Sequence, residues 1–171
     1  MITPDTKDWT WVLDEPCSQC GYDAAAVDPA TVGERVRAAL PRWQEALSRP
    51  DALTRAREDV WSPLEYGCHV RDVFTIFDGR LQQMLTLDGP EFANWDQDVT
   101  AVEQRYGEQD PAAVAVELAA AGSTIAARFD GVSGLQWDRP ATRSDGARFT
   151  TASFSRYFLH DIEHHLHDVG A

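Results

Sequence analysis

The sequence is poor in lysine, in cysteine and in long apolar runs, and each shortage excludes a class of protein. Lys7 is the single lysine among 15 basic residues, which face 28 acidic ones, so the formal net charge is −13. That charge repels phosphate and argues against nucleic acid or an anionic membrane as the main partner. Three cysteines are too few for a disulfide framework.

No apolar run comes close to the roughly 20 residues that cross a bilayer. The N-terminal stretch MITPDTKDWTWVLDEPC also lacks the basic-then-apolar order of a signal peptide. We therefore expect a cytoplasmic protein that does not enter a membrane. A length of 171 residues with 43% hydrophobic side chains is enough for one globular core.

Cap residues locate the starts of the first two predicted helices. Thr31 followed by Glu34 has the spacing of a capping box, and Pro41 is expected to bend or interrupt the helix that follows. The second helix is predicted to begin after Ser62, with a proline at the first position and Glu65 at the third.

Two more helices and two long connections complete the pattern. A third helix is predicted after Asp110, and a fourth from about residue 150 to residue 169. Residues 86–110 are expected to form a polar and aromatic loop with a helical turn near 102–106. Residues 130–149 are rich in turn signals and suit a short hairpin.

These elements predict an all-α fold, a four-helix bundle with long connections and an N-terminal arm. We divide the chain into an arm at residues 1–30, which carries a C-x-x-C motif, and a bundle domain at residues 31–171. The alanine-rich face of Ala112–Ala121 would suit packing in a homodimer.

Four of the five histidines lie in LHDIEHHLHDV, residues 159–169. At about 100° per residue, the apolar stripe of this helix is centred opposite His160. Asp161 and His165, four residues apart, fall at the inward edge of the stripe. His160 and His164 form a second pair with the same spacing, which is expected outside the bundle or beneath a separate cover.

His69 lies among apolar residues of the second helix and is placed to meet Asp161 and His165 across the bundle. Two ligands from one helix and one from another would leave coordination positions open, as in a catalytic metal site. The alternative is a hydrogen-bonded core histidine beside a simple Asp–His ion pair.

Cys17 and Cys20 offer a second combination. Together with His160 and His164 they form a two-cysteine, two-histidine set that would hold a structural zinc and attach the arm to the last helix. Free thiols, or a redox-active pair, remain alternatives for the same cysteines.

The segments WSPLEYGCHVRD, NWDQD, RSDG and RYFLHDIEHHLHDV resemble the DinB-like superfamily over about residues 31–169. This family of four-helix bundles includes thiol-dependent S-transferases and the mycothiol-dependent maleylpyruvate isomerase. The resemblance implies zinc or nickel held by His69 with Asp161 and His165, or with His160 and His164 in another registration. Asp161 is shorter than the glutamate typical of the isomerase branch.

The resemblance implies a metal-dependent S-transferase that uses a small thiol, mycothiol in particular, on small electrophiles. The alternative is a non-catalytic metal- or ligand-binding protein of the stress response. Arg80, Trp95 and Asp96 are the candidate residues for binding the co-substrate. Asp168, Asp96 or Asp98 would orient ligand imidazoles, and Arg143 and Arg148 are further cations for an anionic substrate.

Overall fold

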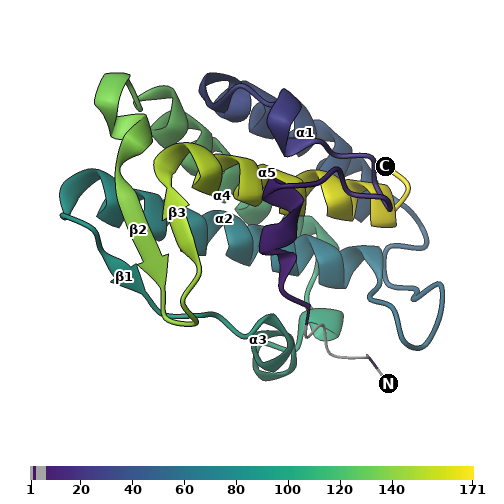
Figure 1. The fold of residues 1–171 in the computed structure, drawn as a ribbon. Coiled ribbons are helices and arrows are strands. Elements are labelled where there is room, and N and C mark those ends of the chain that lie inside the picture. Colours follow the sequence, from purple (N-terminus) through teal and green to yellow (C-terminus); the bar gives the residue numbers. More distant parts are fainter. Residues whose placement is uncertain (1, 3–6) are drawn as a thin grey trace.

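The computed structural model describes residues 2 and 7–171, so residues 1 and 3–6 of the predicted arm lie outside the described part. The fold is the predicted four-helix bundle, in which α4 and α5 both pack against α1 and α2 (Figure 1). Its helices are α1 (Val32–Ser48), α2 (Pro63–Thr86), α3 (Gln97–Glu103), α4 (Pro111–Asp130) and α5 (Thr151–Asp168). Its strands are β1 (Glu91–Phe92), β2 (Pro140–Arg143) and β3 (Arg148–Thr150).

Side-chain caps begin three of the four long helices where the sequence predicts them. The Ser62 hydroxyl accepts from the backbone N–H of Glu65, and the Glu65 carboxylate accepts from the N–H of Ser62 at 2.8 Å. Asp110 caps α4, and Thr150 caps α5. Such caps satisfy backbone donors that the first turn leaves free, and here they fix the register of the helices.

The start of α1 differs from the prediction. Thr31 has helical backbone angles and makes no capping bond; its hydroxyl instead donates to the carbonyl of Asp28 at 2.8 Å. Asp28 caps a 3-10 turn that runs directly into α1, so the capping box of Thr31 and Glu34 is wrong. The helix continues through Pro41 without interruption.

The connection between α2 and α4 is more ordered than the expected loop. Asp96 caps α3 through the N–H of Val99, which starts the helical segment earlier than the predicted turn. β1 pairs in parallel with β2, and β2 pairs with β3 in the predicted hairpin. This small sheet lies at the N-terminal end of α5 (Figure 1).

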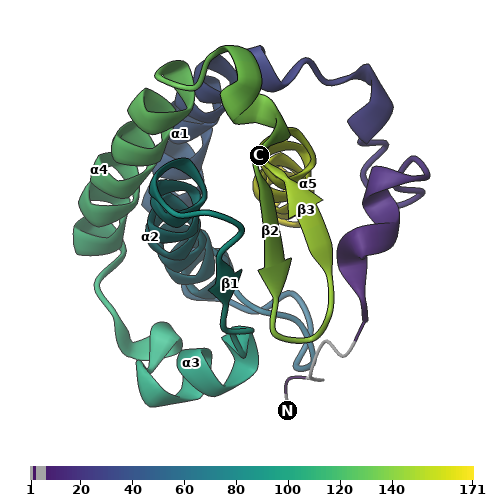
Figure 2. The ribbon, with the colours of Figure 1, turned by 60° about the vertical axis from the view of Figure 1, so that its left-hand side comes forward.

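The N-terminal arm contains short 3-10 helices and lies along α5, on the side away from α4 (Figure 2). The Tyr22 hydroxyl donates to the carbonyl of Arg156 at 2.6 Å, and Arg156 Nε donates to the carbonyl of Val27 at 3.0 Å. Cys17, Tyr22 and Val27 are buried in the same hydrophobic core as the bundle helices. The arm therefore covers one face of α5.

Among the described helices, α4 is long and apolar enough to cross a membrane by length and composition alone, with a mean hydropathy of 1.3. Val114, Leu118 and Ile125 on its inner face are buried in the bundle, which explains the apolar composition. Its outer face exposes Val116 by 70%. A homodimer through that face stays a prediction, as does the cytoplasmic location.

Candidate functional site

A cleft of about 520 Å³ opens between α2, α5, the segment before α3 and the N-terminal arm. Phe77 and Arg80 line it from α2, and Tyr157 and Asp161 line it from α5. Lys7, Asp8 and Trp9 close it from the arm. The cleft is thus built from segments that are far apart in the sequence.

His69, Asp161 and His165 come together beside this cleft. His69 Nε2 lies 3.3 Å from Asp161 Oδ1, and His165 Nε2 lies 3.8 Å from the same oxygen. One donor atom of each side chain lies within 4.8 Å of the others. The spacing of four residues on α5 stacks two of them on one face, and α2 brings the third across the bundle.

The bonding of this trio fits a cation. Both ring nitrogens of His69, which is fully buried, and Oδ1 of Asp161 lack a hydrogen-bond partner in the described part of the chain. Buried polar atoms are rarely left without partners, because each costs about 1–3 kcal/mol. Two imidazoles and a carboxylate are ligands that zinc accepts, and three protein ligands leave a coordination position open.

Asp168 orients one of the candidate ligands. Its Oδ2 lies 2.8 Å from Nδ1 of His165, which leaves Nε2 of that ring facing Asp161. Burial opposes ionisation of Asp168, but the hydrogen bond with His165 and the charges of the neighbouring histidines together outweigh it and lower the pKa of the carboxyl group. Metal-binding histidines usually have such a partner on the second nitrogen.

Asp161 is held as an anion. Burial alone would raise its pKa, but the neighbouring His69 and then His165 outweigh that effect and lower the pKa of Asp161 to about 2. A charged carboxylate between two imidazoles would offset part of the charge of a divalent cation.

Aromatic rings fix the His69 imidazole from several sides. Trp95 stacks on it with ring centroids 5.4 Å apart and planes 4° apart, and Trp61 lies 5.4 Å away on centroids. Trp95 in turn donates from Nε1 to the hydroxyl of Thr100 at 2.7 Å. Asp96 lines the cleft, but its carboxylate caps α3 and does not orient His69.

The sequence matches the family described as the DinB superfamily over residues 33–169, most of the chain. The chain belongs to the DinB superfamily. Among solved structures it is similar to YfiT from Bacillus subtilis, with a TM-score of 0.69 and 18% identity over 83% of each chain. YfiT is described as a probable metal-dependent hydrolase with an unusual four-helix bundle topology. No curated protein matches the sequence.

In this DinB-superfamily chain, two buried arginines line the cleft. Arg143 is bound to Asp145 and, at 3.2 Å, to the Tyr157 hydroxyl. Arg80 donates to the carbonyl of Ala93 at 2.8 Å, and no carboxylate of the described residues lies within 4 Å of it. Burial, and then the charge of Arg143, lower the pKa of Arg80 to about 10, so it stays charged at neutral pH.

A buried arginine without a counter-ion is costly unless an anion completes its environment. Arg80 is 7% exposed and lies next to a second cation, an arrangement that suits a carboxylate ligand. Arg148, predicted as another cation for the substrate, is exposed on β3 and does not line the cleft.

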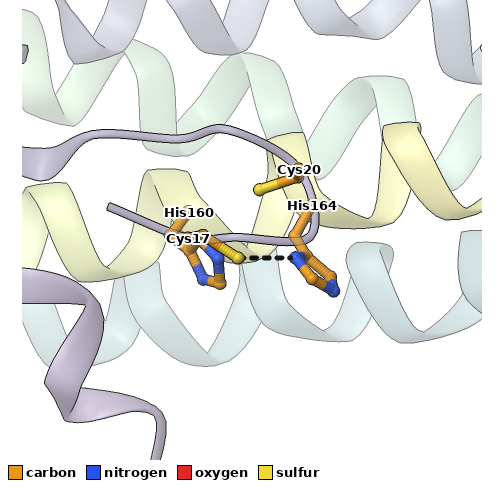
Figure 3. Close-up of side chains that lie close together, drawn as sticks. All are labelled: Cys17, Cys20, His160 and His164. Atoms are coloured by element: carbon orange, nitrogen blue, oxygen red, sulfur yellow. Dashed lines mark hydrogen bonds between the residues drawn. The ribbon is translucent and has the colours of Figure 1, made fainter. Parts of the chain in front are cut away.

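The remaining predicted ligands form a separate group, partly outside the DinB-superfamily match. Cys17 and Cys20, which precede residue 33, lie against His160 and His164 (Figure 3). Both histidines are buried, and their rings pack against Trp9 and Tyr22 of the arm. The registration that pairs them with His69 is therefore not the one that the structure brings together.

Several residues that line the site were not indicated by the sequence, among them three aromatic side chains. Tyr157 lies one turn before Asp161 on α5, so its position on the ligand face was available as a signal. Trp61 and Trp9 reach the site from a loop and from the arm, where no helical period indicates which way a side chain faces.

Proposed function

We propose that the protein is a metal-dependent transferase that joins a low-molecular-weight thiol to a small electrophile in the cleft. Mycothiol is the thiol, and zinc the metal with nickel as the alternative, on the strength of the family resemblance. The observation that carries the proposal is the fully buried His69 imidazole, whose nitrogens make no hydrogen bond within the described residues and whose Nε2 lies 3.3 Å from Asp161 Oδ1, beside His165. This set would hold one cation with an open position at the cleft.

Zinc in this position would lower the pKa of a bound thiol, which provides a thiolate nucleophile at neutral pH. The side chains around it have separate tasks. Asp161 supplies negative charge, Asp168 holds the His165 ring in orientation, and Trp95 keeps the His69 ring in place.

The arginines indicate the class of electrophile. Arg80 is buried in the wall of the cleft, where it donates to the carbonyl of Ala93, and Arg143 is held beside it by Asp145 and Tyr157. These cations would bind a carboxylate of the electrophile and orient its reactive carbon toward the thiol. An anionic electrophile is therefore favoured over a neutral one.

A non-catalytic metal- or ligand-binding role in the stress response is the second candidate, and it uses the same trio without turnover. Hydrolysis is a third, because the similar fold of YfiT is described as that of a probable metal-dependent hydrolase. In a hydrolase, water would replace the thiol as the nucleophile.

The test measures loss of mycothiol in the presence of an unsaturated dicarboxylate or of chlorodinitrobenzene, together with the metal content of the protein. We expect His69→Ala to abolish thiol consumption and to lose one metal equivalent. His167→Ala changes an exposed histidine of α5 outside both ligand groups and should change neither. Arg80→Gln should retain the metal but raise KM for the dicarboxylate more than for the neutral electrophile.

Activity that survives in His69→Ala would overturn the proposal. Turnover of an ester or amide without thiol would favour the hydrolase. A protein that binds metal at His69 but consumes no electrophile with any thiol would favour the non-catalytic role.

A further inference from the structure

The arm and α5 bring four metal-binding side chains together outside the cleft. We call them the Cys2His2 cluster, which consists of Cys17, Cys20, His160 and His164. One donor atom of each lies within 4.8 Å of all the others. Figure 3 shows the two sulfurs from the arm beside the two imidazoles from α5, with Cys17 Sγ 3.7 Å from His164 Nδ1.

The backbone of the arm holds the two thiols on one side of a tight turn. The N–H of Gly21 donates to the carbonyl of Cys17 at 2.8 Å, and the N–H of Cys17 donates to the carbonyl of Tyr22 at 2.8 Å. Gly21 has φ +77°, a left-handed conformation that glycine adopts without strain. The turn thereby directs both sulfurs toward α5.

Three members of the cluster are buried, Cys20 is partly exposed, and the group is incompletely bonded. Cys17, His160 and His164 are 1%, 4% and 5% exposed. His160 Nε2 has no hydrogen-bond partner among the described residues, although the ring is enclosed by Trp9 and Tyr22. Apolar packing would not require two imidazoles and two thiols here, whereas a cation would satisfy them together.

We propose that the Cys2His2 cluster binds a structural zinc ion that fastens the N-terminal arm to α5. Two thiolates and two imidazoles are a ligand set that zinc binds tetrahedrally, and four protein ligands leave no position for a substrate. This site is closed, in contrast to the open trio beside it, and its assignment does not depend on the proposed S-transferase activity.

The zinc would also shape the cleft. Trp9 lies in the same arm, eight residues before Cys17. Its ring packs on both histidines of the cluster, with centroids 5.5 Å from His160 and 5.2 Å from His164. The same Trp9 lines the cleft together with Asp161. Fixing the arm on α5 therefore fixes one wall of the cleft.

Asp168 connects the two ligand groups. Its Oδ2 lies 2.8 Å from His165 Nδ1 and 3.7 Å from His164 Nε2. The carboxylate thus lies beside one candidate ligand of each site, and a change in the orientation of either imidazole would be felt at the other.

The first experiment counts zinc in protein purified under reducing conditions and saturated with zinc. The His69→Ala background disables the trio and leaves the cluster, so this variant should hold one zinc equivalent. Adding Cys20→Ser to it should remove that equivalent. Adding Cys68→Ser instead, which changes a buried thiol outside the cluster, should not.

A second measurement guards against a change of fold. Cobalt(II) added to the His69→Ala protein should give the near-ultraviolet absorption of thiolate-to-metal charge transfer, and Cys17→Ser with Cys20→Ser should abolish it while circular dichroism keeps its helical signal. Removing zinc from His69→Ala should speed hydrogen exchange in the arm, around residues 9–27, far more than in α4.

Two results would overturn the proposal. One is zinc content that is unchanged by Cys20→Ser in the His69→Ala background. The other is an intact mass two daltons low, from a Cys17–Cys20 disulfide, in protein that takes up no zinc after reduction. Because every measurement uses the His69→Ala protein, in which the trio cannot bind metal, neither result tests the proposed transferase activity.

Discussion

At the residue scale, Asp168 gives the sharpest test of how the candidate ligands are oriented. Its bond to His165 Nδ1, at 2.8 Å, fixes which nitrogen faces Asp161. Removing such a partner typically costs about 10- to 100-fold in metal affinity. We expect Asp168→Asn, measured in the Cys20→Ser background by competition with a chelator, to weaken zinc binding at the trio by that amount.

The control is Asp138→Asn, which removes an exposed carboxylate away from both ligand groups. Unchanged affinity in Asp168→Asn would show that the helix and the Tyr66 ring, 4.9 Å from His165 on centroids, orient this imidazole without Asp168.

Glu65 gives a prediction about acid stability. It is buried at the start of α2, where it pairs with Arg55 and completes the capping box of Ser62. Burial raises its pKa, but the bond to Arg55 and the bonds to Ser62 outweigh this and lower the pKa below the usual 4.5. A lowered pKa means that ionised Glu65 stabilises the fold above pH 4.5, and that this stability is lost as the pH falls through the folded-state value.

We expect Glu65→Gln to lower the free energy of unfolding at pH 7 by about 1–3 kcal/mol, and to flatten its decline below pH 4.5. Urea titrations at several pH values measure both effects. Glu45→Gln, an exposed change on α1, should leave the pH profile as it is in the wild type. If the free energy of unfolding of Glu65→Gln fell with pH as steeply as that of the wild type, the assigned ion pair would be contradicted.

At the scale of elements, α1 and α4 approach closely at Gly33. A Cβ there would lie 2.7 Å from the carbonyl oxygen of Ala126, a backbone atom of the facing helix. Overpacking of this kind costs about 1–3 kcal/mol, so Gly33→Ala should destabilise the bundle by that amount in thermal or urea unfolding.

Gly79→Ala is the matched control, because Gly79 lies within α2 and nothing stands within 4 Å of the added Cβ. Alanine is favoured over glycine in a helix by up to about 1 kcal/mol. We therefore expect opposite signs for the two substitutions, and equal losses of stability would contradict the close approach of α1 and α4.

Local signals explain which elements were predictable. Ser62 with Pro63, and Asp110 with Pro111, fix helix starts through contacts only a few residues long. β1 has two residues and exists because it pairs with β2 about fifty positions later, which no local pattern reveals. Thr31 failed as a cap because the 3-10 turn before it already supplies the helix entry.

The same reasoning separates the parts of the candidate site. The spacing of Asp161 and His165 follows from the helical period, so the sequence was sufficient to place them on one face of α5. The burial of His160 and His164 depends on where the arm lies. The helical period of α5 indicates only that these two histidines face away from its apolar stripe. The contact of Trp9 with the site could not be predicted either, because it also depends on the position of the arm.

At the scale of the whole molecule, the arm turns a common bundle into a chain with two ligand groups on one helix. The DinB-superfamily match begins at residue 33, so it includes the trio and both histidines of the cluster but neither cysteine. The chain carries a net charge of −13. Arg80, which is buried without an ion-pair partner among the described residues, is a basic side chain that lines the cleft of this acidic protein. Five aspartates and three basic residues line the cleft, so a small anion would be recognised locally by the two arginines and not by the charge of the cleft as a whole.

The order of ligands along α5 restricts how this chain can change in length. His160 directly precedes Asp161, and His164 directly precedes His165, so the two pairs alternate along the sequence and lie about 100° apart around the helix. One residue inserted ahead of His160 would turn the segment by about 100°, present an all-imidazole pair to His69 and withdraw it from the cysteines. Such an insertion would give His69 two histidine partners but place the inserted residue and Glu163 at the positions that face the cysteines, so the Cys2His2 cluster would be lost.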